Sequence, residues 1–257
     1  MKKSGHFNAI LLSPVFALLV ISASVLRDAE AQVFSQDLTL HSTVTSPGMG
    51  GMGGGSATST DYCSKNALKT SSSDGNDSII RFDTEKLISI DNKKKTYSEL
   101  TFKQLQELLS QAQAELGGMS EEELAMVKKV MGQTATSFSV AKLGPGENIA
   151  GYATEKYLLK GPVEVEIWAA PDLKIPPAYY DAMQFQMPPN PMFDMQKMYS
   201  EMKKIAGIPL KTVMTMRMMG KEMKTTRVVT SIEKGPIPAS VFEIPAGYKR
   251  VNAGLGE

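Results

Sequence analysis

Histidine, the side chain most often used as a general base by enzymes, is scarce in this sequence. The chain has two histidines, His6 and His41. His6 lies in an N-terminal segment that we expect to be removed, and His41 has no second histidine or cysteine at a spacing typical of metal ligands. A Ser-His-Asp arrangement would have to use His41, and no nucleophile-elbow motif is present. The sequence therefore predicts no catalytic role for His41.

The charged clusters have simple structural interpretations. Glu121–Glu123 lie in the first turn of an expected helix, where negative charge complements the helix dipole. Glu164 and Glu166 share one strand face about 7 Å apart. A carboxylate pair could use that spacing, but an exposed strand face explains it better. Lys93–Lys95 solvate an expected hairpin tip. With no phosphate-binding loop or cofactor motif, we predict a non-enzymatic protein with no cofactor and no catalytic residues.

Methionine is the residue type present in unusual number. There are 17, of which eleven lie between Met183 and Met223. A helix expected over residues 191–206 has one apolar face and one polar face. The apolar face carries Met192, Met195, Met198, Tyr199, Met202 and Ile205, and the polar face carries Lys197, Ser200, Glu201 and Lys204. On the following strand Met214, Met216 and Met218 share a face, so we expect this strand and the helix to face one another.

Three interpretations of the methionines stay open. Apolar residues at helical spacing usually form packed core. Flexible, polarizable thioethers also suit a deformable pocket for an apolar ligand such as a lipid. Soft-metal binding, chiefly of Cu(I), is the third interpretation. For a pocket, the candidate lining residues are Leu105, Leu108, Leu109, Met192, Met195, Tyr199, Met202, Met214, Met216 and Met218.

The N-terminus has the features of a signal peptide. Lys2 and Lys3 precede an apolar run, and the small residues Ala29 and Ala31 form a signal-peptidase site. A membrane anchor is the alternative, but the core of the run, Ala9 to Ile21, is shorter than the ~20 residues of a spanning helix. We expect residues 1–31 to be removed, leaving residues 32–257 as a single domain that is periplasmic or secreted.

Charge and cysteine content limit the classes of function. Without residues 1–31 the chain has 25 basic and 25 acidic residues. Because a nucleic-acid-binding protein normally carries a basic excess, we expect no such partner. No second apolar stretch could span a membrane. The single Cys63 cannot form an internal disulfide, so it is either a small strand residue or a reactive or intermolecular thiol.

The elements that must position these residues predict an α+β fold. Short segments of extended character, separated by turns, indicate about ten strands in one curved antiparallel sheet, a half-barrel. About three helices, over 101–117, 120–132 and 191–206, are expected on its concave face. Capping boxes at Thr101–Gln104 and Ser120–Glu123 begin the first two helices. A Gly/Met-rich loop at 46–56 is expected as a hairpin tip rather than a linker, a last strand over 240–244, and a tail over 251–257.

Several short motifs, taken in order, resemble the family known as domain of unknown function 4412. These are SDGNDSII (73–80), LISIDNKKKTY (87–97), IAGY (149–152) with EKY (155–157), EIWA (166–169) and VFEIPAGY (241–248). The family resembles the bacterial lipoprotein-carrier group (LolA/LolB-like), in which a curved antiparallel sheet wraps helices and encloses an apolar cavity. The resemblance implies an envelope protein that carries a lipid or lipoprotein, and it brings no catalytic residues.

Three functions follow as hypotheses. The first is an exported, non-enzymatic binding or carrier protein with a methionine-rich apolar pocket. The second is a copper-binding envelope protein, and the third is a structural or stress-related envelope component. The sequence does not decide the oligomeric state.

The export signal gives a direct test. Because Ala29 and Ala31 supply the small side chains that signal peptidase accepts, protein recovered from the envelope should begin at Gln32. N-terminal sequencing or intact-mass measurement checks this, and an intact Met1 would contradict it.

Overall fold

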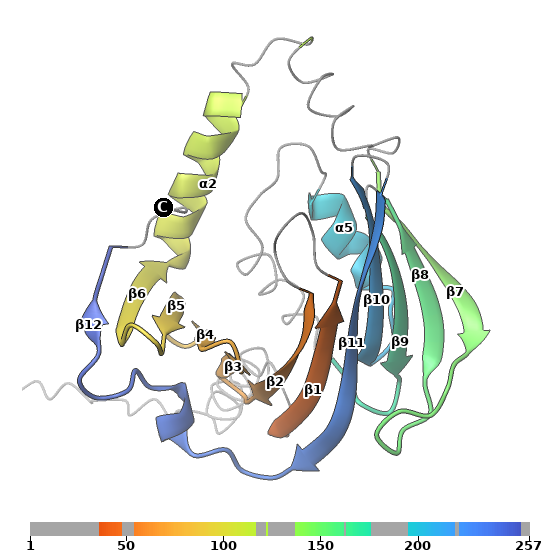
Figure 1. The fold of residues 1–257 in the computed structure, drawn as a ribbon, viewed down its shortest axis with the longest axis horizontal. Coiled ribbons are helices and arrows are strands. Elements are labelled where there is room, and N and C mark those ends of the chain that lie inside the picture. Colours follow the sequence, from red (N-terminus) through yellow and green to blue (C-terminus); the bar gives the residue numbers. More distant parts are fainter. Residues whose placement is uncertain are drawn as a thin grey trace, which may run out of the picture. The chain divides into compact units, whose positions relative to one another are not determined.

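The computed structural model describes residues 36–47, 54–116, 122, 137–161, 163–175, 195–218 and 221–252. In these ranges twelve strands form one open, curved sheet (Figure 1), in the order β12-β6-β5-β4-β3-β2-β1-β11-β10-β9-β8-β7. The strands are β1 (Leu38–Ser46), β2 (Gly55–Cys63), β3 (Ala67–Ser72), β4 (Asn76–Arg81), β5 (Lys86–Asp91), β6 (Thr96–Thr101), β7 (Ser139–Pro145), β8 (Glu155–Lys160), β9 (Glu164–Ala170), β10 (Ile208–Met218), β11 (Lys221–Lys234) and β12 (Lys249–Arg250). The helices are α2 (Phe102–Leu116), α5 (Met195–Met202) and the 3₁₀ helix η1 (Ala239–Phe242).

Two antiparallel meanders meet at the centre of the sheet. Strands β1 to β6 form one, and strands β7 to β11 form the other. They join where β1 pairs with β11, which brings together strands from opposite ends of the domain. Strands β1 and β2 also pair directly up to Ser46 and Gly55, on either side of the Gly/Met-rich segment.

Local sequence accounts for the tight turns of the first meander. In the turn before β4, Gly75 has φ +95°, a conformation that favours glycine, and Asp74 Oδ1 accepts a 2.9 Å hydrogen bond from the Asn76 N–H. After β5, Asp91 Oδ1 accepts hydrogen bonds from the N–H groups of Lys93 and Lys94. These two turns fix the lengths of the strands on either side.

Helix α2 begins at the capping box that the sequence predicts. The Gln104 N–H donates to Thr101 Oγ1 at 3.1 Å, and the Thr101 N–H donates to Gln104 Oε1 at 2.9 Å. Two backbone donors at the helix start are thereby satisfied. The expectation of a helix over 101–117 is confirmed.

Both faces of the sheet are covered near β4. Ile79 and Ile80 are each 0% exposed although successive strand residues point to opposite faces. Ile80 packs with Leu40 and Leu210 on one face, while Ile79 packs with Phe242 of η1 on the other. The segment after β11 therefore serves as the cover of one sheet face.

The expected strand count of about ten is too low, because twelve strands form. One reason is the segment 55–72, which forms two strands, β2 and β3, with a turn between them. The Ser64 N–H donates to the Ala67 carbonyl in this turn at 2.9 Å. The turn contains no glycine or proline, the residues that most clearly mark a turn in a sequence.

The expected last strand over 240–244 is wrong. These residues include part of η1, in which the Val241 N–H donates to the Pro238 carbonyl at 3.0 Å. Prolines at 236, 238 and 245 remove the N–H donors that a strand ladder needs. Strand β12 follows instead and pairs with β6 in parallel, so the sheet is antiparallel except at this edge.

Two of the three expected α-helices appear among the described ranges. They lie within the expected helices 101–117 and 191–206, and α5 is shorter than expected. The expected helix over 120–132 falls outside the described residues, apart from residue 122.

Removing the Phe242 side chain tests the role of η1 as a cover. Phe242 is 5% exposed, so Phe242→Ala should lower the free energy of unfolding by about 3–5 kcal/mol, measured by urea denaturation. Leu143→Ala is the control, because Leu143 is 53% exposed and a surface change of this kind should stay within about 0.5 kcal/mol. Equal effects of the two substitutions would show that η1 does not cover a core.

Candidate functional site

A cavity of about 620 Å³ lies against one face of the sheet, bordered by strands of both meanders and by α5. Its apolar lining includes Leu40, Val44, Cys63, Leu68, Leu159, Val165, Ile167, Ile175, Met198, Met202, Ile208, Pro209 and Met214. Polar residues contribute a smaller part, chiefly Ser59, Asp61, Thr70, Ser72, Thr212 and Arg227. The volume is within the range of about 300–1,000 Å³ found for small-molecule sites.

Strand alternation and register bring these residues to one face. Leu40 lies opposite Asp61 on β2, and Asp61 lies opposite Thr70 on β3. In the other meander, Met214 lies opposite Val165 on β9. Directly opposite residues point the same way, so the pairs Leu40 and Val44 on β1, and Thr212 and Met214 on β10, reach the cavity from alternating positions.

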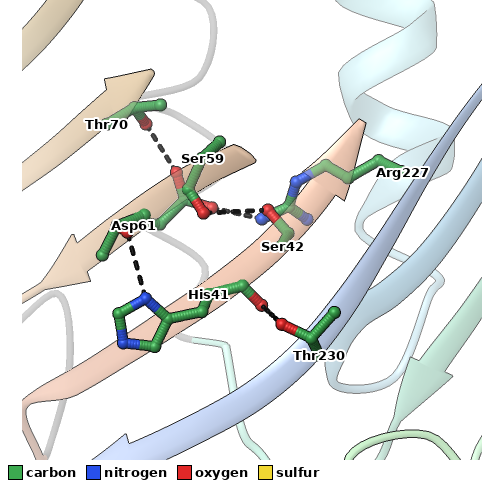
Figure 2. A network of polar contacts seen from close by, with 8 residues as sticks. His41, Ser42, Ser59, Asp61, Thr70, Arg227 and Thr230 are labelled. Carbon is green, nitrogen blue, oxygen red and sulfur yellow. Dashed lines mark hydrogen bonds and ion pairs between the residues drawn. The ribbon is translucent and has the colours of Figure 1, made fainter. Parts of the chain in front are cut away.

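A β-bulge decides which face Arg227 occupies. Up to His41, the partners on β11 follow a regular antiparallel register, but Ser42 then pairs with Val229 and Thr230 is passed over. Val44 consequently lies opposite Arg227. Without this extra residue, Arg227 would point to the other face of the sheet. Thr230 Oγ1 donates to the His41 carbonyl at 3.1 Å, beside the bulge (Figure 2).

Helix α5 contributes two methionines to the cavity lining, Met198 and Met202, which lie one turn apart. Tyr199 packs with Tyr157 and Ile167 between the helix and the sheet, and burial raises the pKa of Tyr199 to about 12. After the helix, Gly207 has φ +89°, and a Cβ there would collide with the Ala170 backbone. This close approach fixes the path from α5 into β10.

Glu201 anchors α5 to the edge strand β7. Although the sequence places Glu201 on the polar helix face, it is 4% exposed, and its Oε2 accepts a 2.9 Å hydrogen bond from the Val140 N–H. Its Oε1 accepts from Lys204 Nζ at 2.6 Å and lies 3.3 Å from Lys197 Nζ. The Lys204 hydrogen bond and then the Val140 hydrogen bond lower the pKa of Glu201 to about 2. Without Glu201, the Val140 N–H on this edge strand would lack a hydrogen-bond partner, which explains why the Glu201 carboxylate turns towards the strand.

Asp61 and Arg227, both in the described lining of the cavity, form an ion pair. Asp61 on β2 accepts a hydrogen bond from Arg227 Nη2 through Oδ2, and its Oδ1 accepts from Thr70 Oγ1 at 2.7 Å. Figure 2 shows Arg227 reaching over β1 to Asp61. The Asp61 and Arg227 side chains are 23% and 25% exposed, so the pair is accessible from the cavity. Nearby, Ser42 Oγ donates to the Ser59 carbonyl at 3.4 Å.

His41 takes no part in the cavity. Its neighbours Leu40 and Ser42 face the cavity side, so His41 points to the opposite face. There its Nδ1 lies 3.1 Å from Thr60 Oγ1 and its Nε2 lies 3.4 Å from Glu233 Oε1. His41 therefore belongs to a network of polar side chains at the protein surface.

Cys63 is a buried free thiol in the cavity lining. It is 7% exposed, and burial, with a smaller contribution from Asp61, raises the pKa of its thiol well above the usual range. Because the thiolate is the reactive form, these surroundings favour the interpretation of Cys63 as a small packing residue.

The predicted pocket residues fall in different places. Met202 and Met214 line the cavity, and Tyr199 packs beside it. Leu105 is buried and Leu108 half-buried in α2, and neither lines the cavity. Met192 and the side chains of Leu109, Met195, Met216 and Met218 lie outside the described part of the structure.

Sequence reasoning missed Asp61 and Arg227. A weak signal existed, because Asp61 is two residues from Cys63 and Arg227 is two residues from Val229, so each shares a face with a buried residue. Nothing in the sequence indicated that these two strand faces meet.

Two features are absent from the described residues. No three His, Cys, Asp or Glu side chains in those ranges gather closely enough to hold a metal ion. None of the helices described there has the length and apolar character needed to cross a membrane.

The Glu201 contacts predict a specific dependence of stability on pH. The folded-state pKa lies below the ordinary value of 4.5, so ionised Glu201 stabilises the fold above about pH 4.5, and this contribution disappears as the pH falls towards about 2. Glu201→Gln should therefore be less stable than the wild type near neutral pH, with a smaller loss of stability between these two pH values. Urea unfolding across this range measures both effects. Glu107→Gln, on the exposed surface of α2, is the control, and parallel profiles for Glu201→Gln and the wild type would contradict the assignment.

Comparison with solved structures finds remote similarities. An uncharacterized conserved protein from Thermus thermophilus is 8% identical, with 91% of this chain and 99% of that chain covered and a TM-score of 0.45. A LolA superfamily protein from Nitrosomonas europaea is 9% identical, with 86% and 96% covered and a TM-score of 0.31. PNGF-II is 10% identical with a TM-score of 0.41 over 86% of this chain, which spans 31% of the length of PNGF-II.

Sequence comparison gives the classification. No curated protein sequence matches the chain. Residues 119–248, about half of the chain, match the sequence model of one protein family. This range includes the strands β7 to β11, helix α5 and Arg227, and therefore much of the cavity. The chain belongs to the family described as domain of unknown function (DUF4412).

Proposed function

We propose that this protein is an exported, non-enzymatic binding or carrier protein that holds an apolar, lipid-like ligand in the cavity between α5 and the sheet. The observation that carries the proposal is the cavity itself, about 620 Å³ in volume and lined mainly by aliphatic and methionine side chains. Burial of apolar ligand surface against such a lining is favourable by roughly 25 cal/mol per Å².

The lining suits a ligand of variable shape. Met198, Met202 and Met214 border the cavity, and their unbranched side chains can repack around different hydrocarbon chains. Two of these methionines lie on α5 and the third on β10, so both the helix side and the sheet side of the lining can adapt to a ligand, an arrangement that fits a carrier.

The proposal includes the expectations made from the sequence about location and architecture. Export through the signal peptide of residues 1–31 would place the protein in the periplasm or outside the cell, where lipids and lipoproteins need carriers. In a half-barrel with helices on its concave face, the helices would shield the ligand from water. The role itself is inferred from the cavity and its lining.

Filling the cavity should weaken ligand binding. Val165 lines the cavity and its neighbour Glu164 is exposed on the opposite face of β9, so Val165→Trp should occupy the ligand volume while Glu164→Trp should not. We expect an uncharged fluorescent lipid analogue to bind the wild type and Glu164→Trp alike, and Val165→Trp at least about tenfold more weakly, a loss of about 1.4 kcal/mol. Fluorescence titration measures binding, and circular dichroism verifies the fold.

Two results would change the assignment. Absence of lipid-analogue binding by the wild type would refute the carrier proposal. A Cu(I) titration of the same protein tests the copper-binding alternative, which requires tight metal binding by the methionine thioethers. If neither binds, the methionines serve as core, and a structural role in the envelope is the remaining hypothesis.

A further inference from the structure

The Asp61–Arg227 pair is the one place where the cavity lining exposes charge, among the residues that the structure describes. A third charged residue, Lys69, also borders the cavity. Its ammonium group, however, lies 3.3 Å from Asp77, on the sheet face covered by η1. The charged part of the lining is therefore one acid and one base in direct contact, with no net charge.

This pair retains hydrogen-bonding capacity on both partners. Arg227 contacts Asp61 through Nη2, and a guanidinium group has further N–H donors on Nε and Nη1. Asp61 accepts from Arg227 and from Thr70, whereas a carboxylate can accept about four hydrogen bonds. With about a quarter of each side chain exposed, both unused donors and unused acceptors are accessible to a ligand.

From this arrangement we propose that the ligand is an amphiphile with a zwitterionic head group, bound with its cation at Asp61 and its anion at Arg227. The inference rests on the proposed function, since the hydrocarbon part of the ligand would occupy the apolar region between β9, β10 and α5. The cavity continues from Asp61 and Arg227 to Val165 and Met202 without leaving one sheet face, so one molecule can contact both regions.

Electrostatics disfavour a ligand with a single negative charge. An anion at Arg227 would lie next to the Asp61 carboxylate, and the repulsion is strong where apolar walls reduce the effective dielectric constant. A lone cation at Asp61 would be repelled by Arg227 in the same way. A zwitterion adds one favourable contact at each partner and leaves the net charge of the site at zero.

The test compares three probes that share one acyl chain and differ in head group. They are lysophosphatidylethanolamine (zwitterionic), lysophosphatidylglycerol (anionic) and monoacylglycerol (uncharged). Wild-type protein should bind the zwitterionic probe about tenfold or more tightly than the anionic one, a ratio typical of a charge-assisted hydrogen bond. Dissociation constants are measured by competition with a fluorescent lipid analogue.

Single-charge variants should shift this preference in opposite directions. Asp61→Asn removes the repulsion, so binding of the anionic probe should tighten and binding of the zwitterionic probe should weaken. Arg227→Gln should weaken binding of both charged probes, with the anionic probe affected more. The double variant Asp61→Asn/Arg227→Gln leaves no unpaired charge, which protects against misfolding, and it should bind both charged probes alike. Binding of monoacylglycerol should stay within about twofold in every variant, because discrimination arises at the head group.

The possible results are distinguishable. Equal binding of the three probes by the wild type, a preference for the anionic probe, or variants that shift all probes together would overturn the head-group inference while leaving the apolar carrier intact. Failure of the wild type to bind any of the probes, including monoacylglycerol, would refute the proposed function and this inference together.

Discussion

The alternation of side chains along a β-strand constrains the whole molecule. Because successive residues point to opposite faces, a sheet of twelve strands has two faces that both need a cover or a use. Near β4, the fully buried neighbours Ile79 and Ile80 show that both faces are covered there. On one face the cover is η1 with the segments beside it, and on the other it is the main core, beside which α5 and the cavity lie.

Short-range features could be predicted from the sequence, and long-range register could not. The Thr101–Gln104 capping box and the Asp74–Gly75 turn depend on residues within three or four positions, so local chemistry specifies them. The pairing of β1 with β11 joins residues nearly two hundred positions apart, and it contains a bulge at Thr230 that no local pattern marks. Since that bulge turns Arg227 towards the cavity, the meeting of Arg227 with Asp61 could not be predicted from the sequence. The methionine-bearing face of α5 was predictable because it follows helical periodicity, while the burial of Glu201 depends on a strand some sixty residues earlier.

An ion pair in an apolar cavity is better explained by specificity than by stability. Partial removal of Asp61 and Arg227 from water has a cost that their mutual attraction offsets only in part. Aliphatic side chains at both positions would extend the apolar lining at a similar or lower free energy. Their presence is understandable if the cavity must distinguish among ligands with similar hydrocarbon chains, since such chains differ little in how they bury against leucine, isoleucine and methionine. The rigid backbone on both sides, set by the β1–β2 and β1–β11 ladders, keeps the two charged groups in place.

The Glu201–Val140 hydrogen bond also affects how the protein behaves in a crowded compartment. Strand β7 is the last strand at its end of the sheet, and an open strand edge can recruit an edge from another molecule and begin aggregation. By occupying the Val140 N–H, the Glu201 carboxylate removes one of the donors that an incoming strand would use. At the opposite end, β12 is two residues long and offers little to pair with. Among the described strands, both ends of this open sheet therefore offer fewer backbone groups to a strand from another molecule.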